Sequence, residues 1–313
     1  MSGTPPVTLL GPQRRPTLPG VVESLSLTGL FAIVTAGWQE REKDDAELSS
    51  YLGGESVNLA LWHRLQDVLD RDPEFAEAFR ARRAMLDEMQ DLYLMGVGHA
   101  MDALLSLYER RSATASLVSR AITDAEEVLR DLDDRHRRRI ASVHGAFYDR
   151  VVPHERPLVR QHRDEVTVAL SGASAAVVAG GHVAALLDAM HLFNVAPLLG
   201  SRPVIAWSAG AMALTERVVL FNDRAPHGPA VPEVYDAGLG LVPGVVALPS
   251  ARKRLLVANG PRMATLARRF APSACVPLDP GAVVSLSSDR SLPAGTLVVR
   301  EDGVVGPSGG SDD

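Results

Sequence analysis

Short uncharged stretches of small and β-branched residues recur near the start and in the second half of the chain. Residues 7–10, 31–37, 175–181 and 203–206 are four of them, and each leads into a glycine or a small-residue turn. Such continuous apolar runs are typical of strands that are buried on both faces of a parallel sheet. The pattern therefore predicts an α/β fold with a mostly parallel sheet flanked by helices.

Between residues 44 and 162 the apolar positions recur every three or four residues, and charged residues fill the gaps. Asp72 followed by Pro73 has the form of a helix cap and first turn, which predicts a helix from residue 73 to about residue 95. One or two more helices are expected within residues 112–149. This segment is predicted to be a large α-helical insertion, acting as a lid or as an interface.

The change of pattern divides the chain. We predict a discontinuous α/β domain made of residues 1–43 and 163–305, interrupted by the helical insertion of residues 44–162. Residues 306–313 are rich in glycine, serine and aspartate, and we predict that this tail is disordered.

The most informative stretch is residues 207–211 (WSAGA), which follows the apolar run of residues 203–206. A buried strand that ends at a tight turn can hold one serine side chain clear of the backbone, as nucleophilic serines are held. The backbone N–H groups that follow can stabilise an oxyanion. Ser208 is therefore a candidate nucleophile, and the alternative is a turn that only lets a helix pack closely on a strand.

The pattern W-S-A-G-A resembles the peptidase E / cyanophycinase family of serine peptidases, whose fold is similar to that of class I glutamine amidotransferases. Further blocks follow in family order at residues 176–182, 238–243, 278–284 and 295–299. They resemble the glycine loop, the strand before the catalytic histidine, and the terminal hairpin region. The resemblance implies a class I glutamine amidotransferase-like fold.

The resemblance also implies roles for individual residues. Ser208 would attack a peptide or amide carbonyl, and the N–H groups of Gly181 and Ala209 would hold the oxyanion. Asp223, fifteen residues after Ser208, stands at the spacing of the family's acidic triad member. A glutaminase that uses an elbow cysteine is disfavoured, because the single cysteine, Cys275, is far from the elbow in sequence.

One departure from the family concerns the catalytic histidine. Ser250 stands where the resemblance puts that histidine, just before the basic run of residues 252–254. Serine cannot accept a proton at neutral pH, so another base is needed or the site is impaired. His182, in the glycine loop, and His227, four residues after Asp223, are the candidate replacements. Each is otherwise a loop histidine without a catalytic role.

The family's substrates are small peptides or branched polymers with an acidic residue at the cleaved bond, so the resemblance implies a small or acidic peptide-like substrate. A basic pocket would be needed, to which Arg252 or Arg224 could contribute, with Gly180 and Trp207 also in contact with the substrate. The competing hypothesis is a catalytically degenerate scaffold whose helical insertion binds a protein or a small molecule.

The composition of the chain restricts the classes of partner and cofactor that we expect it to bind. The net charge of −6 over 313 residues argues against a nucleic-acid or anionic-membrane surface. No histidine–cysteine cluster has metal-ligand spacing, and no phosphate or dinucleotide motif is present, so no metal or cofactor is expected. The single Cys275 suits a reducing compartment, which with no signal peptide pattern favours a cytoplasmic protein. The oligomeric state is open, a homodimer included.

Residues 166–187 carry no charged side chain over a length that could span a bilayer. Several glycines and serines interrupt this stretch, and leucines are few. A buried helix, a strand and a glycine loop explain it better than a membrane span does.

Overall fold

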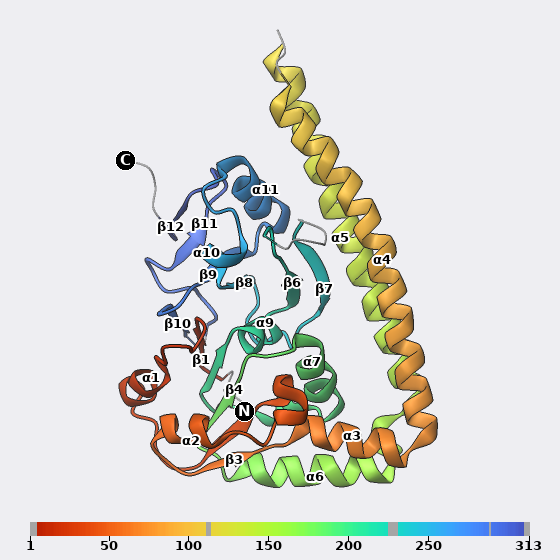
Figure 1. Cartoon of the computed structure of the whole chain (residues 1–313), viewed down its shortest axis with the longest axis vertical. Helices are drawn as coiled ribbons and strands as arrows, with labels where there is room; N and C mark the ends of the chain where they lie inside the picture. Colours follow the sequence, from red (N-terminus) through yellow and green to blue (C-terminus); the bar gives the residue numbers. More distant parts are fainter. Residues whose placement is uncertain (1–4, 111–113, 225–230, 288, 310–313) are drawn as a thin grey trace.

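The computed structural model describes residues 5–110, 114–224, 231–287 and 289–309. Its main sheet has six strands in the order β10-β1-β5-β4-β2-β3. β1, β5, β4, β2 and β3 run parallel, and β10 pairs with β1 in the antiparallel direction at one edge. The predicted mostly parallel α/β sheet is therefore confirmed (Figure 1).

The strands of the main sheet are β1 (Val7–Leu10), β2 (Phe31–Val34), β3 (Ser56–Asn58), β4 (Ala175–Val178), β5 (Val204–Trp207) and β10 (Val283–Leu286). The helices are α1 (Leu18–Ser24), α2 (Ala46–Leu52), α3 (Leu61–Arg71), α4 (Pro73–Glu109), α5 (Ala115–Val151), α6 (Pro157–Ser171), α7 (Val183–Leu192), α8 (Val195–Leu198), α9 (Ala209–Leu214), α10 (Ala251–Arg254) and α11 (Gly260–Phe270). The described residues also form the 3-10 turns η1 (Ala36–Arg41) and η2 (Pro153–Glu155).

Alternate residues of the central strands face two different cores. Val204 and Ala206 of β5 belong to the large core that α3, α6 and α7 cover, whereas Ile205 and Trp207 belong to the core under α1 and α2. Side chains alternate between the two faces of a strand, so a strand that is covered on both sides must be apolar throughout. This explains why the sequence shows continuous apolar runs.

A second sheet has the order β12-β11-β9-β8, and β6 pairs with β7 in a separate ribbon. These strands are β6 (Arg217–Leu220), β7 (Glu233–Ala237), β8 (Val245–Pro249), β9 (Ala274–Leu278), β11 (Leu297–Val299) and β12 (Val305–Pro307). Cys275 of β9 is buried, and burial raises the pKa of its thiol to about 12. β8 and β9 run parallel, so their carboxyl ends lie side by side.

Two expectations about this second sheet are wrong. The strand before residue 250 is β8, whereas residues 238–242 form a connection that makes only an isolated bridge between Thr215 and Val242. Residues 278–284 and 295–299 do not form one hairpin, because β10 joins β1 in the main sheet while β11 pairs with β9 and β12. Local pattern cannot tell which strand an edge residue will pair with.

The insertion is dominated by the antiparallel pair α4 and α5, which lies along one side of the molecule and projects beyond it (Figure 1). The predicted cap at its start is confirmed, because the Asp72 carboxylate accepts a hydrogen bond from the Phe75 amide at 3.0 Å. Both helices have 37 residues, so α4 extends beyond the predicted end near residue 95. Gly96 and Gly98 lie within α4 and do not end it.

A buried network joins this hairpin to the body. Asp133 of α5 pairs with Arg269 of α11 at 2.7 Å, and their side chains are 3% and 1% exposed. The Tyr93 hydroxyl of α4 donates to Asp133 at 2.7 Å, and burial raises the pKa of this tyrosine. A buried carboxylate and guanidinium that satisfy each other in this way fix the position of the hairpin on the body.

The predicted segment boundaries differ from the structure in two places. Strand β3 of the main sheet falls within the range 44–162, so the helical hairpin proper covers residues 73–151. Residues 306 and 307 belong to β12, and the rest of the predicted disordered tail from residue 310 lies outside the described residues. Among the described residues, no helix is both long and apolar enough to cross a membrane.

Candidate functional site

Ser208 joins β5 directly to α9 in a strained backbone conformation. Its φ is 51° and its ψ is −123°, values that a residue with a Cβ atom rarely adopts. Holding a non-glycine residue there costs about 1–3 kcal/mol, which the surrounding structure must offset. This is the geometry of a serine presented at a sharp strand-to-helix elbow, as the sequence predicts.

Two glycines allow the elbow to pack against β4. A Cβ atom at Gly210 would lie 2.4 Å from the Val178 carbonyl oxygen, and one at Gly180 would lie 2.8 Å from the Ser208 Cβ. Both distances are far below van der Waals contact, so no larger residue fits at either position without a shift of the backbone. Gly180 and Gly210 therefore allow the end of β4 and the loop after it to lie close to the Ser208 elbow.

The predicted oxyanion donors lie beside Ser208. Gly181 and Ala209 both line the cavity into which Ser208 opens. Within the described part of the chain, neither backbone N–H makes a hydrogen bond. The neighbouring His182 N–H does, because it donates to the Gly37 carbonyl at 2.7 Å and fixes the loop. Two backbone donors are thus available to an incoming oxygen atom.

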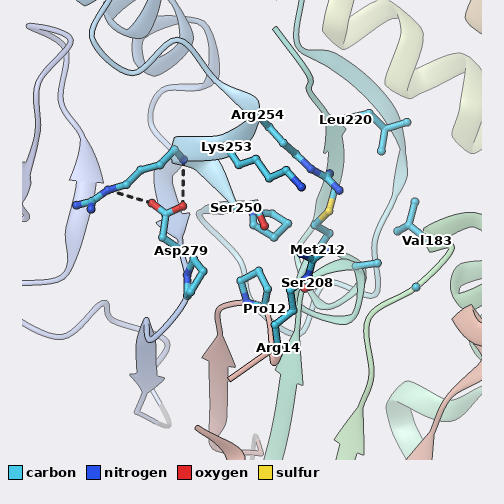
Figure 2. A pocket seen from close by; sticks show the side chains of 15 residues that line it. Pro12, Arg14, Val183, Ser208, Met212, Leu220, Ser250, Lys253, Arg254 and Asp279 are labelled. Carbon is cyan, nitrogen blue, oxygen red and sulfur yellow. Dashed lines mark hydrogen bonds and ion pairs between the residues drawn. The ribbon is translucent and has the colours of Figure 1, made fainter. Parts of the chain in front are cut away.

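The cavity has a volume of about 760 Å³ and an excess of positive charge. Arg14, Arg252, Lys253 and Arg254 line it, against one carboxylate, that of Asp279. Figure 2 shows Lys253 and Arg254 extending from α10 toward the part of the cavity that holds Ser208. Such a cavity attracts anionic groups.

The carboxylate of Asp279 is already engaged. It accepts a hydrogen bond from the Arg252 backbone N–H at 3.0 Å, and the Arg252 side chain, 79% exposed, lies 3.6 Å from its second oxygen (Figure 2). Lys253 and Arg254 line the cavity as well, and among the described residues neither has a carboxylate partner. Arg252, which the sequence singled out, is the one basic residue of α10 with a carboxylate partner among the described residues.

Topology explains why these residues meet. Ser208 follows β5, which lies between β1 and β4, so the loops after those two strands flank it. Ser250 and Asp279 follow β8 and β9, whose carboxyl ends face the same cavity. Sites in α/β proteins form at the carboxyl ends of parallel strands for this reason.

Ser250 lines the cavity in the left-handed conformation, with φ 57° and ψ 40°. Its backbone N–H donates to the Leu278 carbonyl at 2.9 Å, which fixes the turn into α10. Of the described residues, no histidine lines this cavity. The position that the resemblance assigns to a histidine thus faces the site, with a hydroxyl in place of an imidazole.

His182 does not serve as a base for Ser208 in this structure. Its Nδ1 accepts a hydrogen bond from the Ala185 N–H at 3.3 Å and caps the start of α7. The ring lines neither cavity beside Ser208, and among the described residues it makes no hydrogen bond to the serine. The expectation that His182 replaces the catalytic histidine is therefore wrong for this conformation. His227, the other candidate, lies outside the described residues.

Asp223 is also placed differently from the prediction. One of its carboxylate oxygens pairs with Arg262 at 2.8 Å, the other accepts from the Leu256 N–H at 3.0 Å, and the side chain is 1% exposed. Its own N–H donates to the Arg254 carbonyl at 2.8 Å. Asp223 therefore holds the end of α10, which carries the basic residues of the cavity, and it does not itself line the cavity beside Ser208.

A second cavity of about 850 Å³ adjoins the first on the other side of Ser208. Both predicted contact residues, Gly180 and Trp207, line it, as do Trp38 and Tyr51. Arg14, Gly181 and Ser208 belong to both cavities, so Ser208 stands where they meet. A ligand that reaches both sides would meet cations on one side and aromatic rings on the other.

Sequence reasoning missed Arg14, Trp38 and Tyr51. Arg14 follows β1 by four residues, and Trp38 follows β2 by four, so the carboxyl ends of predicted strands were the available signal. Tyr51 lies in α2 and gave no such signal. Among the described residues, no group of three or more histidine, cysteine or acidic side chains could hold a metal ion.

No protein-family model matches the chain, and no curated protein matches it. Among solved structures, the crystal structure of a peptidase from an acI-B1 Actinobacterium is similar, with a TM-score of 0.44 and 13% sequence identity. The similarity covers 96% of this chain and 92% of that one. At this TM-score and identity the likeness carries no residue roles across.

Proposed function

We propose that this protein binds a carboxylate-bearing peptide or amide in the cationic cavity and hydrolyses it slowly through Ser208. The observation that carries the proposal is the strained conformation of Ser208 beside the free N–H groups of Gly181 and Ala209. Backbone strain of this kind persists where the surrounding structure enforces it, and such positions cluster at functional sites.

The cationic side chains that line the cavity, Arg14, Lys253 and Arg254, support a carboxylate-bearing substrate, and we call them the cationic wall. A carboxylate of the ligand would face Lys253, Arg254 and Arg14, while its carbonyl carbon lies against Ser208. Charge-assisted hydrogen bonds to guanidinium and ammonium groups are about twice as strong as neutral ones, and they would orient the ligand. The oxyanion that forms on attack would be held by Gly181 and Ala209.

The absence of a histidine among the described lining residues limits the rate. Attack by Ser208 requires loss of its hydroxyl proton, and in this cavity that proton would pass to hydroxide from solvent. An oxyanion hole and binding alone leave about 10³–10⁴-fold acceleration over water, far below a complete triad. The rate should then rise about tenfold per pH unit, without the plateau that a titrating imidazole gives near neutral pH.

The test is hydrolysis of two chromogenic anilides, one of aspartate and one of asparagine, measured from neutral to alkaline pH. The proposal expects a slow, hydroxide-dependent reaction that favours the aspartyl compound and is lost in Ser208→Ala. Ser250→Ala, in the same cavity, is the matched control and should retain the rate. Undiminished hydrolysis in Ser208→Ala would overturn the proposal, and a plateau near neutral pH would show that an imidazole acts as base.

A second candidate is a scaffold that binds without turnover. Two observations favour it: Ser250 occupies the position assigned to the histidine, and Asp223 is committed to Arg262. This candidate expects aspartate-type ligands to bind with no hydrolysis at any pH and no covalent adduct with a fluorophosphonate. In that case the helical hairpin is the part of the molecule to examine for a partner.

A further inference from the structure

The outer face of α4 carries a regular seam. The residues of this seam are alternately four and three positions apart in the sequence. Contact residues have this spacing where two helices pack along each other. All eight are exposed: Ala81, Met85, Glu88, Leu92, Met95, His99, Asp102 and Ser106. We call these eight residues the α4 seam.

The α4 seam exposes several large apolar side chains to solvent. Met85, Leu92 and Met95 are 51%, 63% and 64% exposed, and they are the three large exposed apolar side chains of α4. The opposite side of α4 packs on α5 and contacts β7, and Figure 1 shows the hairpin at the flank of the molecule. Apolar residues gathered on one exposed stripe mark an interaction surface.

The positions of the α4 seam are spaced symmetrically about a point between residues 93 and 94. When a second α4 runs antiparallel about that point, Leu92 faces the partner's Met95, and Glu88 faces the partner's His99. The outer positions pair as Met85 with Asp102 and Ala81 with Ser106. Beyond the seam, Glu77 falls opposite Arg110, and both residues are exposed.

We infer that the α4 seam binds a second copy of this chain, so that the α4 helices of the two hairpins pack against each other in antiparallel orientation. The centre of the contact is apolar, and acidic residues fall opposite a histidine and an arginine on either side of it. A two-fold interface requires this self-complementarity, because each position is used twice. A different protein as partner would place no such constraint on the order of residues along α4.

The size of the contact fits a reversible dimer. From the rise and diameter of a helix, the seam together with the flanking Glu77 and Arg110 gives a contact about 50 Å long and about 10 Å wide. Two such faces bury on the order of 1,000 Å² in total, near the lower limit for a specific interface. We therefore expect a dimer that forms at micromolar concentration and dissociates on dilution.

The first experiment is the mass of the purified full chain by light scattering across the micromolar range. The wild type is expected at twice its chain mass of 33.4 kDa, with dissociation on dilution. Leu92→Asp should be monomeric, because it puts a charge at the centre of the apolar contact. Leu117→Asp is the matched control, since Leu117 is 61% exposed on α5 and lies off the seam. A wild type that stays monomeric, or a dimer that survives Leu92→Asp, would overturn the inference.

The register has its own test. The double variant Leu92→Cys with Met95→Cys should cross-link on mild oxidation, and Leu117→Cys should not; the native Cys275 is 1% exposed and does not compete. Glu77→Arg should weaken the dimer, and adding Arg110→Glu should restore it. Failure of the restored pair, or a cross-link only through residue 117, would contradict the antiparallel arrangement. Hydrolysis at Ser208 plays no part in either readout.

Discussion

Ser208 and Ser250 are two serines at the ends of two strands, and both line the same cavity. Each occupies a backbone conformation with positive φ, 51° and 57° respectively, at the point where a short helix begins. They differ in ψ, which is −123° at Ser208 and 40° at Ser250. The first conformation is rare for any residue with a side chain, whereas the second is the left-handed region that several polar residues visit.

The comparison of the two serines separates the features of the site that the backbone provides from those that a side chain must provide. At Ser208 the elbow, the glycine contacts and the free N–H groups depend on chain geometry, and all are present. At Ser250 the turn is equally well formed, but the imidazole that resemblance assigns there is missing. The cavity thus combines a serine at a strand-to-helix elbow with two free N–H groups, and no histidine is among its described lining residues.

The largest expected effect comes from restoring an imidazole at the second elbow. Ser250→His should raise hydrolysis of an acidic anilide about 10²-fold at neutral pH, the lower end of what a general base contributes, because Asp223 is not free to orient the ring. Its pH profile should level off above the pKa of the histidine. The left-handed conformation accepts histidine better than most residues, so the fold should survive.

The control for that gain is the double variant Ser208→Ala with Ser250→His. A gain that persists in the double variant would show that the new histidine acts without Ser208. Unchanged activity in Ser250→His, with folding intact by circular dichroism, would mean that the two elbows do not cooperate on one substrate.

A smaller effect is expected from the cationic side chains that line the same cavity as the two elbows. Lys253→Gln or Arg254→Gln should each weaken binding of an aspartate-type ligand about tenfold, and added salt should reduce the difference. Arg252→Gln is the matched control and should change the affinity little, because Arg252 is 79% exposed and faces Asp279. Titration calorimetry measures all three, and equal losses would mean that the wall acts only through its net charge.

The smallest effect concerns the stability of the elbows. Ser208→Gly should raise the free energy of unfolding by about 1 kcal/mol, since relief of the strain outweighs the entropy that glycine loses on folding. Ser250→Gly should change it by about 0.5 kcal/mol or less, because the left-handed turn is less costly for serine. Urea denaturation of both variants makes the comparison, and a destabilised Ser208→Gly would mean that this elbow is not strained.

Much of the fold could be predicted because its strands are locally encoded. Residues 175–178 and 204–207 are apolar throughout, and residues 7–10 are uncharged, since both faces of the sheet are covered. The pairing of β10 with β1, nearly 280 residues apart, left no comparable signal. Pairing depends on which edges remain free after the core has formed, and no short window of sequence contains that information.

The candidate site likewise has features that are encoded locally and features that depend on contacts between distant segments. The sequence by itself determined the strand, the serine and the small residues of the Ser208 elbow, because a tight turn restricts which residues can occupy it. Only the tertiary structure decided that Arg14 joins Lys253 and Arg254 at the cavity, and that Asp223 is bound to Arg262, 39 residues further along the chain. Turns follow from short-range backbone sterics, whereas the partner of a charged side chain is set by packing between distant segments.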